Sequence, residues 1–186
     1  RLTGTDMEVE LVATVENVES EGNFSITVPA RKFLDIVKSL PADIPIQLSC
    51  RDEGVVIQCG KSKFVLSTLA ADQYPNLEVL NSDLDITVTR NELRSLIDGT
   101  HFSMANQDVR YYLNGMSIEI EGSTIRTVAT DGHRLALGVD KLPNDTGQQR
   151  QIIVPRKGIM EILRLLEADD TQITISITSN HIRIAD

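Results

Sequence analysis

The chain is poor in cysteine and histidine, with two cysteines and three histidines in 186 residues. Cys50 and Cys59 lie in alternating apolar segments without CxxC spacing, so we expect two reduced, partly buried thiols rather than a disulfide or a metal site. His101, His133 and His181 also lack the spacing of metal ligands. We therefore expect neither a bound metal nor another cofactor.

Long apolar runs are also absent. No segment approaches the roughly 18 apolar residues that a membrane span needs, and no basic start followed by an apolar centre suggests a signal peptide. The expected compartment is the cytoplasm. Arg1 is not an initiator methionine, and the strand pattern of residues 182–184 stops close to the last residue. We therefore expect a fragment of a longer protein.

Basic charge is scarce overall, since the net charge is −9. Residues 1–23 carry six acids and one base, whereas residues 24–66 carry six bases and four acids. A net negative charge argues against a nucleic-acid partner only on average, because an acidic protein can still gather its bases on one surface. Charge alone leaves this class of partner open.

The sequence contains an internal repeat, in which residues 28–40 align without a gap on residues 154–166. In each copy a short strand runs into a proline, Pro29 or Pro155, which we place at the first helical position. Alternating strands follow both copies. The two helices share one apolar face at helical spacing, formed by Phe33, Ile36, Val37 and Leu40 and by Ile159, Ile162, Leu163 and Leu166.

A third helix is expected after Thr89, which has capping-box spacing to Glu92. Its apolar face consists of Leu93, Leu96, Ile97 and Thr100. The resulting order, in which β-hairpins are interrupted by single helices, predicts an α+β fold with sheets covered on one side by helices. Polar residues around positions 74–83 predict two domains, residues 1–80 and 81–186.

The repeated helices carry bases on their outer faces. Arg31 and Lys38 have the same spacing as Lys157 and Arg164, with an acid between each pair, and the third helix adds Arg90 and Arg94. These bases fit a solvated face with helical ion pairs worth about 0.2–0.5 kcal/mol each. They equally fit a basic surface assembled by the repeat, and the spacing does not decide between the two.

Residues 101–136 hold two unusual segments joined by an alternating hairpin that turns at residues 121–123. The alternation is set by Met116, Ile118 and Ile120, then by Ile125 and Val128. The first segment, residues 106–112, offers an amide, a cation and two tyrosines, which fit either core and rim packing or base stacking. The second is the heptapeptide TDGHRLA at residues 130–136.

Asp131 and His133 of the heptapeptide are expected to alternate on a strand and to face one side. A hydrolase built on this pair would need a nucleophile and an orienting group, and neither has a discernible place. We therefore expect no enzyme. Besides the hydrolase, a second alternative is a peptide-binding scaffold that does not act on DNA. In such a protein the helical bases would not gather on one surface.

The two segments, in this order and spacing, closely resemble the middle domain of the bacterial sliding clamp family, the β subunit of DNA polymerase III. The resemblance covers almost the whole chain, including residues 2–6 and 153–158. It implies the DNA-clamp fold, in which repeated β-α-β-β-β units place antiparallel sheets outside and helices along a central channel. The chain would hold a first domain without its N-terminal part and a middle domain without its last strand.

The resemblance also implies function: a non-catalytic homodimeric ring that encircles duplex DNA without reading its sequence and works beside the bacterial nucleoid. The replicative polymerase subunit and the clamp loader would bind it through short peptides. The implied DNA contacts are Arg31, Lys32, Lys38, Arg90, Arg94, Gln107, Arg110, Tyr111, Tyr112, Arg156, Lys157 and Arg164. The implied peptide pocket, completed by residues beyond Asp186, comprises Leu113, Thr130, Gly132, His133, Arg134 and Leu135. The implied dimer contacts are Lys61, Lys63, Phe64 and Leu66.

Overall fold

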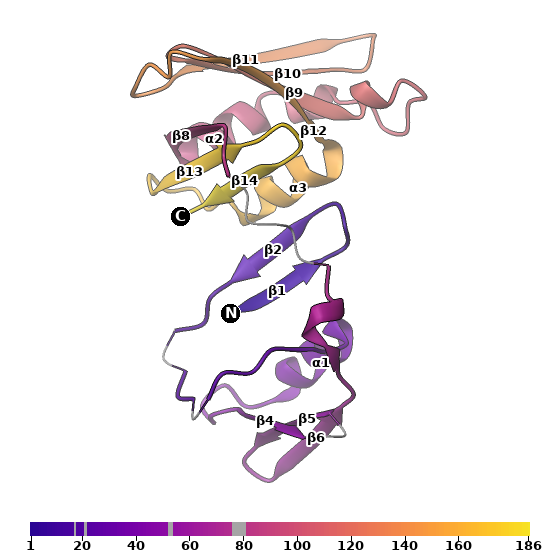
Figure 1. The fold of residues 1–186 in the computed structure, drawn as a ribbon. Coiled ribbons are helices and arrows are strands. Elements are labelled where there is room, and N and C mark those ends of the chain that lie inside the picture. The colour runs from indigo at the N-terminus through magenta and orange to yellow at the C-terminus, as the bar shows by residue number, and fades with distance from the viewer. Residues whose placement is uncertain (17, 21, 52–53, 76–80) are drawn as a thin grey trace. The chain divides into compact units, whose positions relative to one another are not determined.

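The computed structural model describes residues 1–16, 18–20, 22–51, 54–75 and 81–186. The chain divides into two compact units, Arg1–Glu78 and Val79–Asp186 (Figure 1). The expected domain boundary at residue 80 falls on residues 76–80, outside the described part of the chain. No described helix is long and apolar enough to span a membrane.

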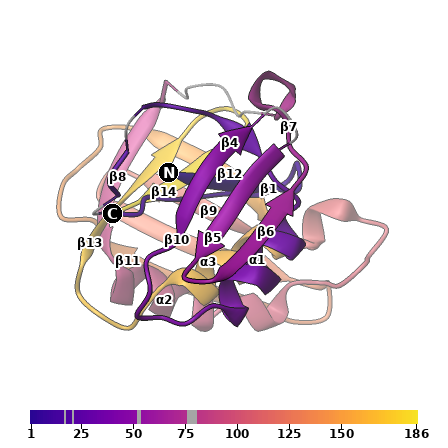
Figure 2. The ribbon, with the colours of Figure 1, turned by 90° about the horizontal axis from the view of Figure 1, so that it is seen from below.

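The first unit consists of small antiparallel sheets and one helix, α1. Two of its sheets have two strands each, β1–β2 and β3–β7, and the third has the order β4-β5-β6. Figure 2 shows β4, β5 and β6 side by side. The bounds are β1 Leu2–Thr5, β2 Glu10–Ala13, β3 Ile26–Thr27, α1 Ala30–Ser39, β4 Gln47–Arg51, β5 Gly54–Cys59, β6 Ser62–Leu66, β7 Leu69–Ala70 and a 3-10 turn, η1, Ala71–Gln73.

The core of the first unit is small. Its buried centre is Val55, Ile57 and Leu66, and Phe33 and Ile36 of α1 pack against it. No residue of α1 is fully buried. The predicted apolar face of this helix is therefore confirmed as the side that contacts the sheet.

The second unit is larger and has two antiparallel sheets, β11-β10-β9-β12 and β14-β13-β8, with two helices packed on them (Figure 1). The bounds are β8 Leu84–Thr89, α2 Arg90–Asp98, η2 His101–Ser103, η3 Tyr111–Leu113, β9 Gly115–Glu121, β10 Thr124–Thr130, β11 Leu135–Lys141, β12 Gln149–Pro155, α3 Arg156–Leu165, β13 Gln172–Ile177 and β14 Ile182–Ala185.

One hydrophobic core joins both sheets and both helices of the second unit. Ile97 of α2, Ile159 of α3, Met116 of β9 and Ile175 of β13 are each at most 1% exposed and belong to one cluster. Helix α2 contacts β8, β10 and β11, while α3 contacts β9 and β12. Burial of this apolar surface is the main stabilising contribution. The predicted α+β fold with antiparallel sheets is confirmed.

Local signals in the sequence predicted several boundaries of helices and turns. The predicted capping box forms, because Glu92 N donates to Thr89 Oγ1 at 3.2 Å and Thr89 N donates to Glu92 Oε2 at 2.7 Å. The hairpin turn at residues 121–123 is also confirmed, with Gly122 at φ +58°. Pro29 and Pro155 precede the first helical position by one residue. Their extended ψ angles and the bond from Phe33 N to Pro29 O are typical of an N-cap.

Two predictions about burial are wrong in part, and the first concerns Val128 of β10. The inward residues of β10 are Ile125, Thr127 and Ala129, so Val128 lies on the other face. Thr127 is tolerated in the core because its hydroxyl donates to Leu96 O at 3.1 Å.

The two cysteines also differ from each other. Both thiols are free, but Cys59 is buried whereas Cys50 is exposed, so the prediction of two partly buried thiols does not hold for Cys50. Both cysteines lie in strands with alternating apolar residues, so the sequence pattern did not distinguish them. In the structure β5 is buried on both faces, whereas most residues of β4 are exposed.

Candidate functional site

The heptapeptide forms the tight turn between β10 and β11. Thr130 Oγ1 donates to Arg134 O at 2.7 Å and accepts from Gly132 N at 3.1 Å. Asp131 Oδ1 accepts from the backbone amides of His133 and Arg134 at 2.9 and 3.0 Å. Gly132 has φ +88°, a conformation that favours glycine.

This geometry corrects the expected strand alternation of Asp131 and His133, which lie in the turn instead. The hydrogen bonds from the amides of His133 and Arg134 hold the pKa of Asp131 below its usual value. The carboxylate is therefore an acceptor that shapes the turn.

Arg134 ties the turn to the neighbouring η2 segment. Its Nε donates to Asp131 Oδ2 at 3.1 Å, and its Nη2 donates to Phe102 O at 2.8 Å. The guanidinium carbon also lies 5.8 Å from the centre of the Phe102 ring, within cation–π range. Leu135, the first residue of β11, is 64% exposed beside this turn. The turn thus presents an apolar side chain on a hydrogen-bonded frame.

Phe102 was missed by sequence reasoning. Its ring is 51% exposed and faces Arg134. An aromatic residue just after the end of the apolar face of α2 was the available signal, but it could equally have indicated a core position.

The loop at residues 106–114 is held by an ion pair. Arg110 Nε donates to Asp108 Oδ1 at 3.0 Å, and its Nη2 donates to Asp108 Oδ2 at 2.9 Å. Asn114 closes the loop, because it accepts from Asp108 N and donates to Asp108 O, both at 2.9 Å. The hydrogen bonds from Arg110 lower the pKa of Asp108 to about 2. The hydrogen bond to Asp108 in turn raises the pKa of Arg110.

The two tyrosines of this loop project into solvent. Tyr111 is 83% exposed and Tyr112 is 50% exposed, with their rings edge to face at 5.8 Å. Gln107, also exposed, has φ +58°. Neither tyrosine packs in the core, so rim packing and stacking on a ligand are the alternatives that remain.

Loop and turn lie against each other. Arg110 Nη2 is 3.5 Å from Asp131 O, and a Cβ atom added to Gly132 would lie 3.1 Å from the same Nη2. Leu113 follows in the same segment, where its amide donates to Arg110 O at 2.9 Å. The structure therefore brings together the loop expected to contact DNA and the turn expected to bind peptide.

Three of the predicted helical bases, Arg90, Arg94 and Arg156, contact residues outside their own helices. Arg90 is 18% exposed and pairs with Asp169 at 3.0 Å, with Glu167 at 3.8 Å and with Asp186. Hydrogen bonding to Asp186 first, and then to Asp169, raises the pKa of Arg90. The acids come from the loop after α3 and from the residue that follows β14, so Arg90 joins elements that are distant in the sequence.

Arg94 and Arg156 play similar parts. Arg94 Nη1 donates to Leu166 O at 2.6 Å, which links the two helices. Arg156 Nη1 lies 3.3 Å from Met104 O, and its backbone amide donates to Asn114 O at 2.9 Å. The first residue of α3 is thereby joined to Asn114, the last residue of the tyrosine loop, and to Met104, which lies just before the loop.

The other predicted helical bases reach solvent. Lys157 and Arg164 are exposed on α3, whose opposite side buries Ile159. Arg164 forms an ion pair with Glu161 at 2.6 Å, yet its side chain remains 72% exposed. On α1 the exposed bases are Arg31, Lys32 and Lys38.

The predicted dimer residues lie on β6 and on the turn that joins it to β5. β6 is an edge strand of its sheet. Phe64 and Leu66 point into the core of the first unit, whereas Lys63 is exposed. Val65, which the sequence pattern did not single out, is 57% exposed on the outer side.

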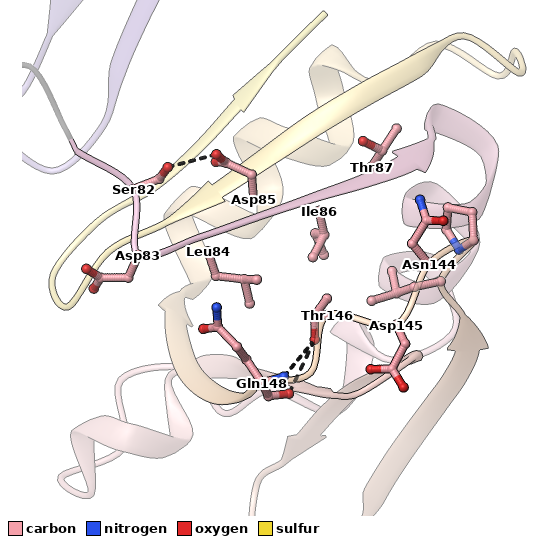
Figure 3. A pocket seen from close by; sticks show the side chains of 12 residues that line it. Ser82, Asp83, Leu84, Asp85, Ile86, Thr87, Asn144, Asp145, Thr146 and Gln148 are labelled. Carbon is pink, nitrogen blue, oxygen red and sulfur yellow. Dashed lines mark hydrogen bonds between the residues drawn. The ribbon is translucent and has the colours of Figure 1, made fainter.

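A cavity of about 360 Å³ lies between β8 and residues 142–148, away from the turn and the loop. Figure 3 shows its polar lining and the hydrogen bond of 2.9 Å from Ser82 to Asp85. Asp83, Asp85 and Asp145 line it, and no lysine or arginine is among the described residues of its lining. An acidic lining repels phosphate, so this cavity is unfavourable for a nucleic-acid backbone.

Two family models match almost the whole chain. Residues 1–78 match the N-terminal domain of the DNA polymerase III beta subunit, and residues 87–186 match its central domain. The chain belongs to the DNA polymerase III beta subunit family. The turn and the tyrosine loop both lie in the central domain of this family.

Curated relatives and solved structures agree with this membership. The beta sliding clamp of Vibrio cholerae is 48% identical over 185 residues, which cover 98% of this chain and 50% of that protein. The crystal structure of the Pseudomonas aeruginosa beta subunit is 46% identical with a TM-score of 0.95, and the match covers 99% of this chain and 51% of that one. A clamp from the same organism bound to griselimycin has a TM-score of 0.89 at 47% identity, over 98% of this chain and 49% of that one. The chain thus spans about half the length of these relatives.

Proposed function

We propose that the protein containing this chain is a DNA sliding clamp, a processivity factor that encircles duplex DNA and tethers the replicative polymerase. Family membership supports this proposal, and so does one local observation. The exposed tyrosine loop lies against the TDGHRL turn, so a surface for DNA and a surface for peptide meet in one domain. The division expected from the sequence, residues 1–80 and 81–186, would then separate the first and middle clamp domains.

The DNA surface acts through backbone phosphates and reads no base edges. We assign direct contact to the exposed helical bases and to the solvent-exposed side chains of the tyrosine loop. The other four predicted bases hold the helices and the loop in place through their carboxylate and carbonyl contacts: Arg90, Arg94, Arg110 and Arg156. The direct contacts are Arg31, Lys32, Lys38, Lys157 and Arg164 with Gln107, Tyr111 and Tyr112.

The peptide surface is built on the turn. Leu135 and Leu113 supply apolar contact, while Thr130, Gly132, His133 and Arg134 shape its rim. The chemistry suits short peptides with apolar side chains, as expected for the polymerase subunit and the clamp loader. Griselimycin, which the P. aeruginosa clamp binds, is the probe that we propose for this surface.

In this proposal the protein is non-catalytic and functions in the bacterial cytoplasm as a homodimeric ring. The edge strand β6 would meet the partner protomer. Lys61 and Lys63 would contribute from its exposed side, whereas Phe64 and Leu66 would support the strand from within. Exposed Val65 joins this set as an apolar contact.

The test is a salt titration of duplex binding, with the longest protein encoded by the reading frame that contains this chain. The affinity should not depend on sequence, and log K should fall with log salt by about 0.9 per phosphate neutralised. Arg164→Gln should reduce that slope by about one contact. Lys141→Gln, which removes an exposed base from β11, should leave the slope unchanged.

Strong preference for one sequence, or no dependence on salt, would contradict the DNA-clamp assignment. Griselimycin binding without any duplex binding would instead favour the alternative, a peptide-binding scaffold that does not act on DNA. Each result therefore separates the two surfaces.

A further inference from the structure

We propose that Arg110 is a positioning residue that couples the two surfaces, so that peptide bound at the turn strengthens DNA binding at the tyrosine loop. This inference rests on the proposed function and adds a regulation to it. Its starting point is that one guanidinium touches both elements. Arg110 is bound to Asp108 of the loop and lies against Gly132 of the turn.

On the loop side, the contact is a fork. Two nitrogens of Arg110 engage the two oxygens of Asp108, and the backbone amide of Arg110 adds a third bond to Asp108 Oδ1 at 2.8 Å. Paired bonds from a planar guanidinium fix orientation as well as distance. The carbonyl of Arg110 then accepts from Leu113 N, which closes the 3-10 turn that carries Tyr111 and Tyr112.

On the turn side, the contact depends on the absence of a side chain. A Cβ on Gly132 would lie 3.1 and 3.2 Å from the two terminal nitrogens of Arg110, so the guanidinium would have to shift. Glycine thus serves two purposes here, since it also permits φ +88°. The close approach places Arg110 beside Gly132, where a ligand that covers the turn could reach it.

These contacts favour a positive coupling, in which a ligand on the turn strengthens DNA binding at the loop. The Arg110 side chain is 48% exposed, so a ligand on the turn can cover it and restrict its motion. A guanidinium held over Gly132 also holds Asp108 and the 3-10 turn, which lowers the cost of ordering the tyrosines for DNA. By linkage, DNA must raise the affinity for the turn ligand by the same factor.

The experiment measures griselimycin affinity by calorimetry in the presence and absence of a short duplex, using the longest protein encoded by the reading frame. We expect duplex to raise the affinity by about fivefold or more. Arg110→Ala should reduce this ratio to one. Arg110→Lys keeps the charge but cannot form the fork, so its ratio should also be close to one. Arg126→Ala, which removes an ion pair with Glu121 elsewhere in the unit, should retain the native ratio.

A second measurement needs no ligand. Gly132→Ala should displace Arg110 and accelerate hydrogen exchange at the amides of Leu113 and Asn114, which close the 3-10 turn. The matched control is Gly147→Ala. Gly147 also has a positive φ, +62°, but nothing lies within 4 Å of its Cβ position. The control should leave both amides unchanged.

The outcomes are separable. If the native protein binds neither duplex nor griselimycin, the proposed function fails, and the coupling fails with it. If it binds both but the ratio is one, or below one, only the coupling is overturned. A native ratio that persists in Arg110→Ala or Arg110→Lys, or equal exchange in the two glycine variants, also overturns the role of Arg110.

Discussion

Thr5 and Thr130 make the same pair of hydrogen bonds in two separate turns. Thr5 Oγ1 donates to Val9 O at 3.0 Å and accepts from the amide two residues on at 3.1 Å. Thr130 Oγ1 donates to Arg134 O at 2.7 Å and accepts from the amide two residues on at 3.1 Å. The aspartate after each threonine accepts from two backbone amides. The two turns therefore match in their hydrogen bonds as well as in the Thr-Asp pair of their sequences.

The residue that follows the aspartate differs between the two turns, and this leads to a stability prediction. Met7 has φ +77° where the second turn has Gly132 at +88°. A side chain at positive φ is strained, so Met7→Gly should stabilise the protein by about 0.5–1 kcal/mol after the entropy cost of glycine. Urea denaturation measures this change. Val15→Gly, at an exposed position without positive φ, should destabilise, and equal effects of both changes would contradict the explanation.

The Asp108–Arg110 pair predicts a dependence of stability on pH. The folded-state pKa of Asp108 is about 2, below the ordinary 3.8, because Arg110 hydrogen-bonds its ionised form. A depressed pKa contributes stability that is fully present above the unfolded-state value and is lost as pH falls through the folded-state value. Asp108→Asn should therefore reduce the loss of stability between about pH 4 and pH 2. Carboxyl carbon NMR of Arg110→Ala should show Asp108 titrating at higher pH; an unchanged midpoint would refute this cause.

The exposed Leu135 side chain predicts a selective binding defect. Leu135→Ala should weaken griselimycin binding by about 1–2 kcal/mol through lost apolar contact and leave duplex binding unchanged. Val139→Ala is the matched control, because Val139 is also exposed on β11, at 56%, but lies farther from the turn. Calorimetry that shows equal losses for both variants would remove Leu135 from the pocket.

The capping box predicts a local stability effect on α2. Thr89→Ala removes the acceptor for Glu92 N and should cost about 1 kcal/mol of unfolding free energy. Thr89→Ser retains a hydroxyl and should cost less than half as much. Urea midpoints measure the difference, and equal midpoints would mean that the cap contributes little.

Much of the fold was predictable from the sequence because its signals are local. The helix after Thr89 follows from a side chain three residues away, and the hairpin at Gly122 follows from one residue suited to positive φ. The helical faces follow from residues within two turns of each other. The TDGHRLA segment and the tyrosine loop likewise identified the family, because each is contiguous.

The fate of individual polar side chains was decided only by tertiary structure. Arg90 and Arg94 look alike on the outer face of α2, yet Arg90 pairs with an acid 79 positions away and Arg94 with the carbonyl of Leu166. Thr127 enters the core only because Leu96 O is there to accept its hydroxyl. Arg110 meets Gly132 because two non-adjacent segments pack together. The sequence by itself determined the helix after Thr89 and the hairpin turn at Gly122, since those depend on neighbours along the chain. Packing selected each polar partner, since a partner must lie within hydrogen-bond distance in space.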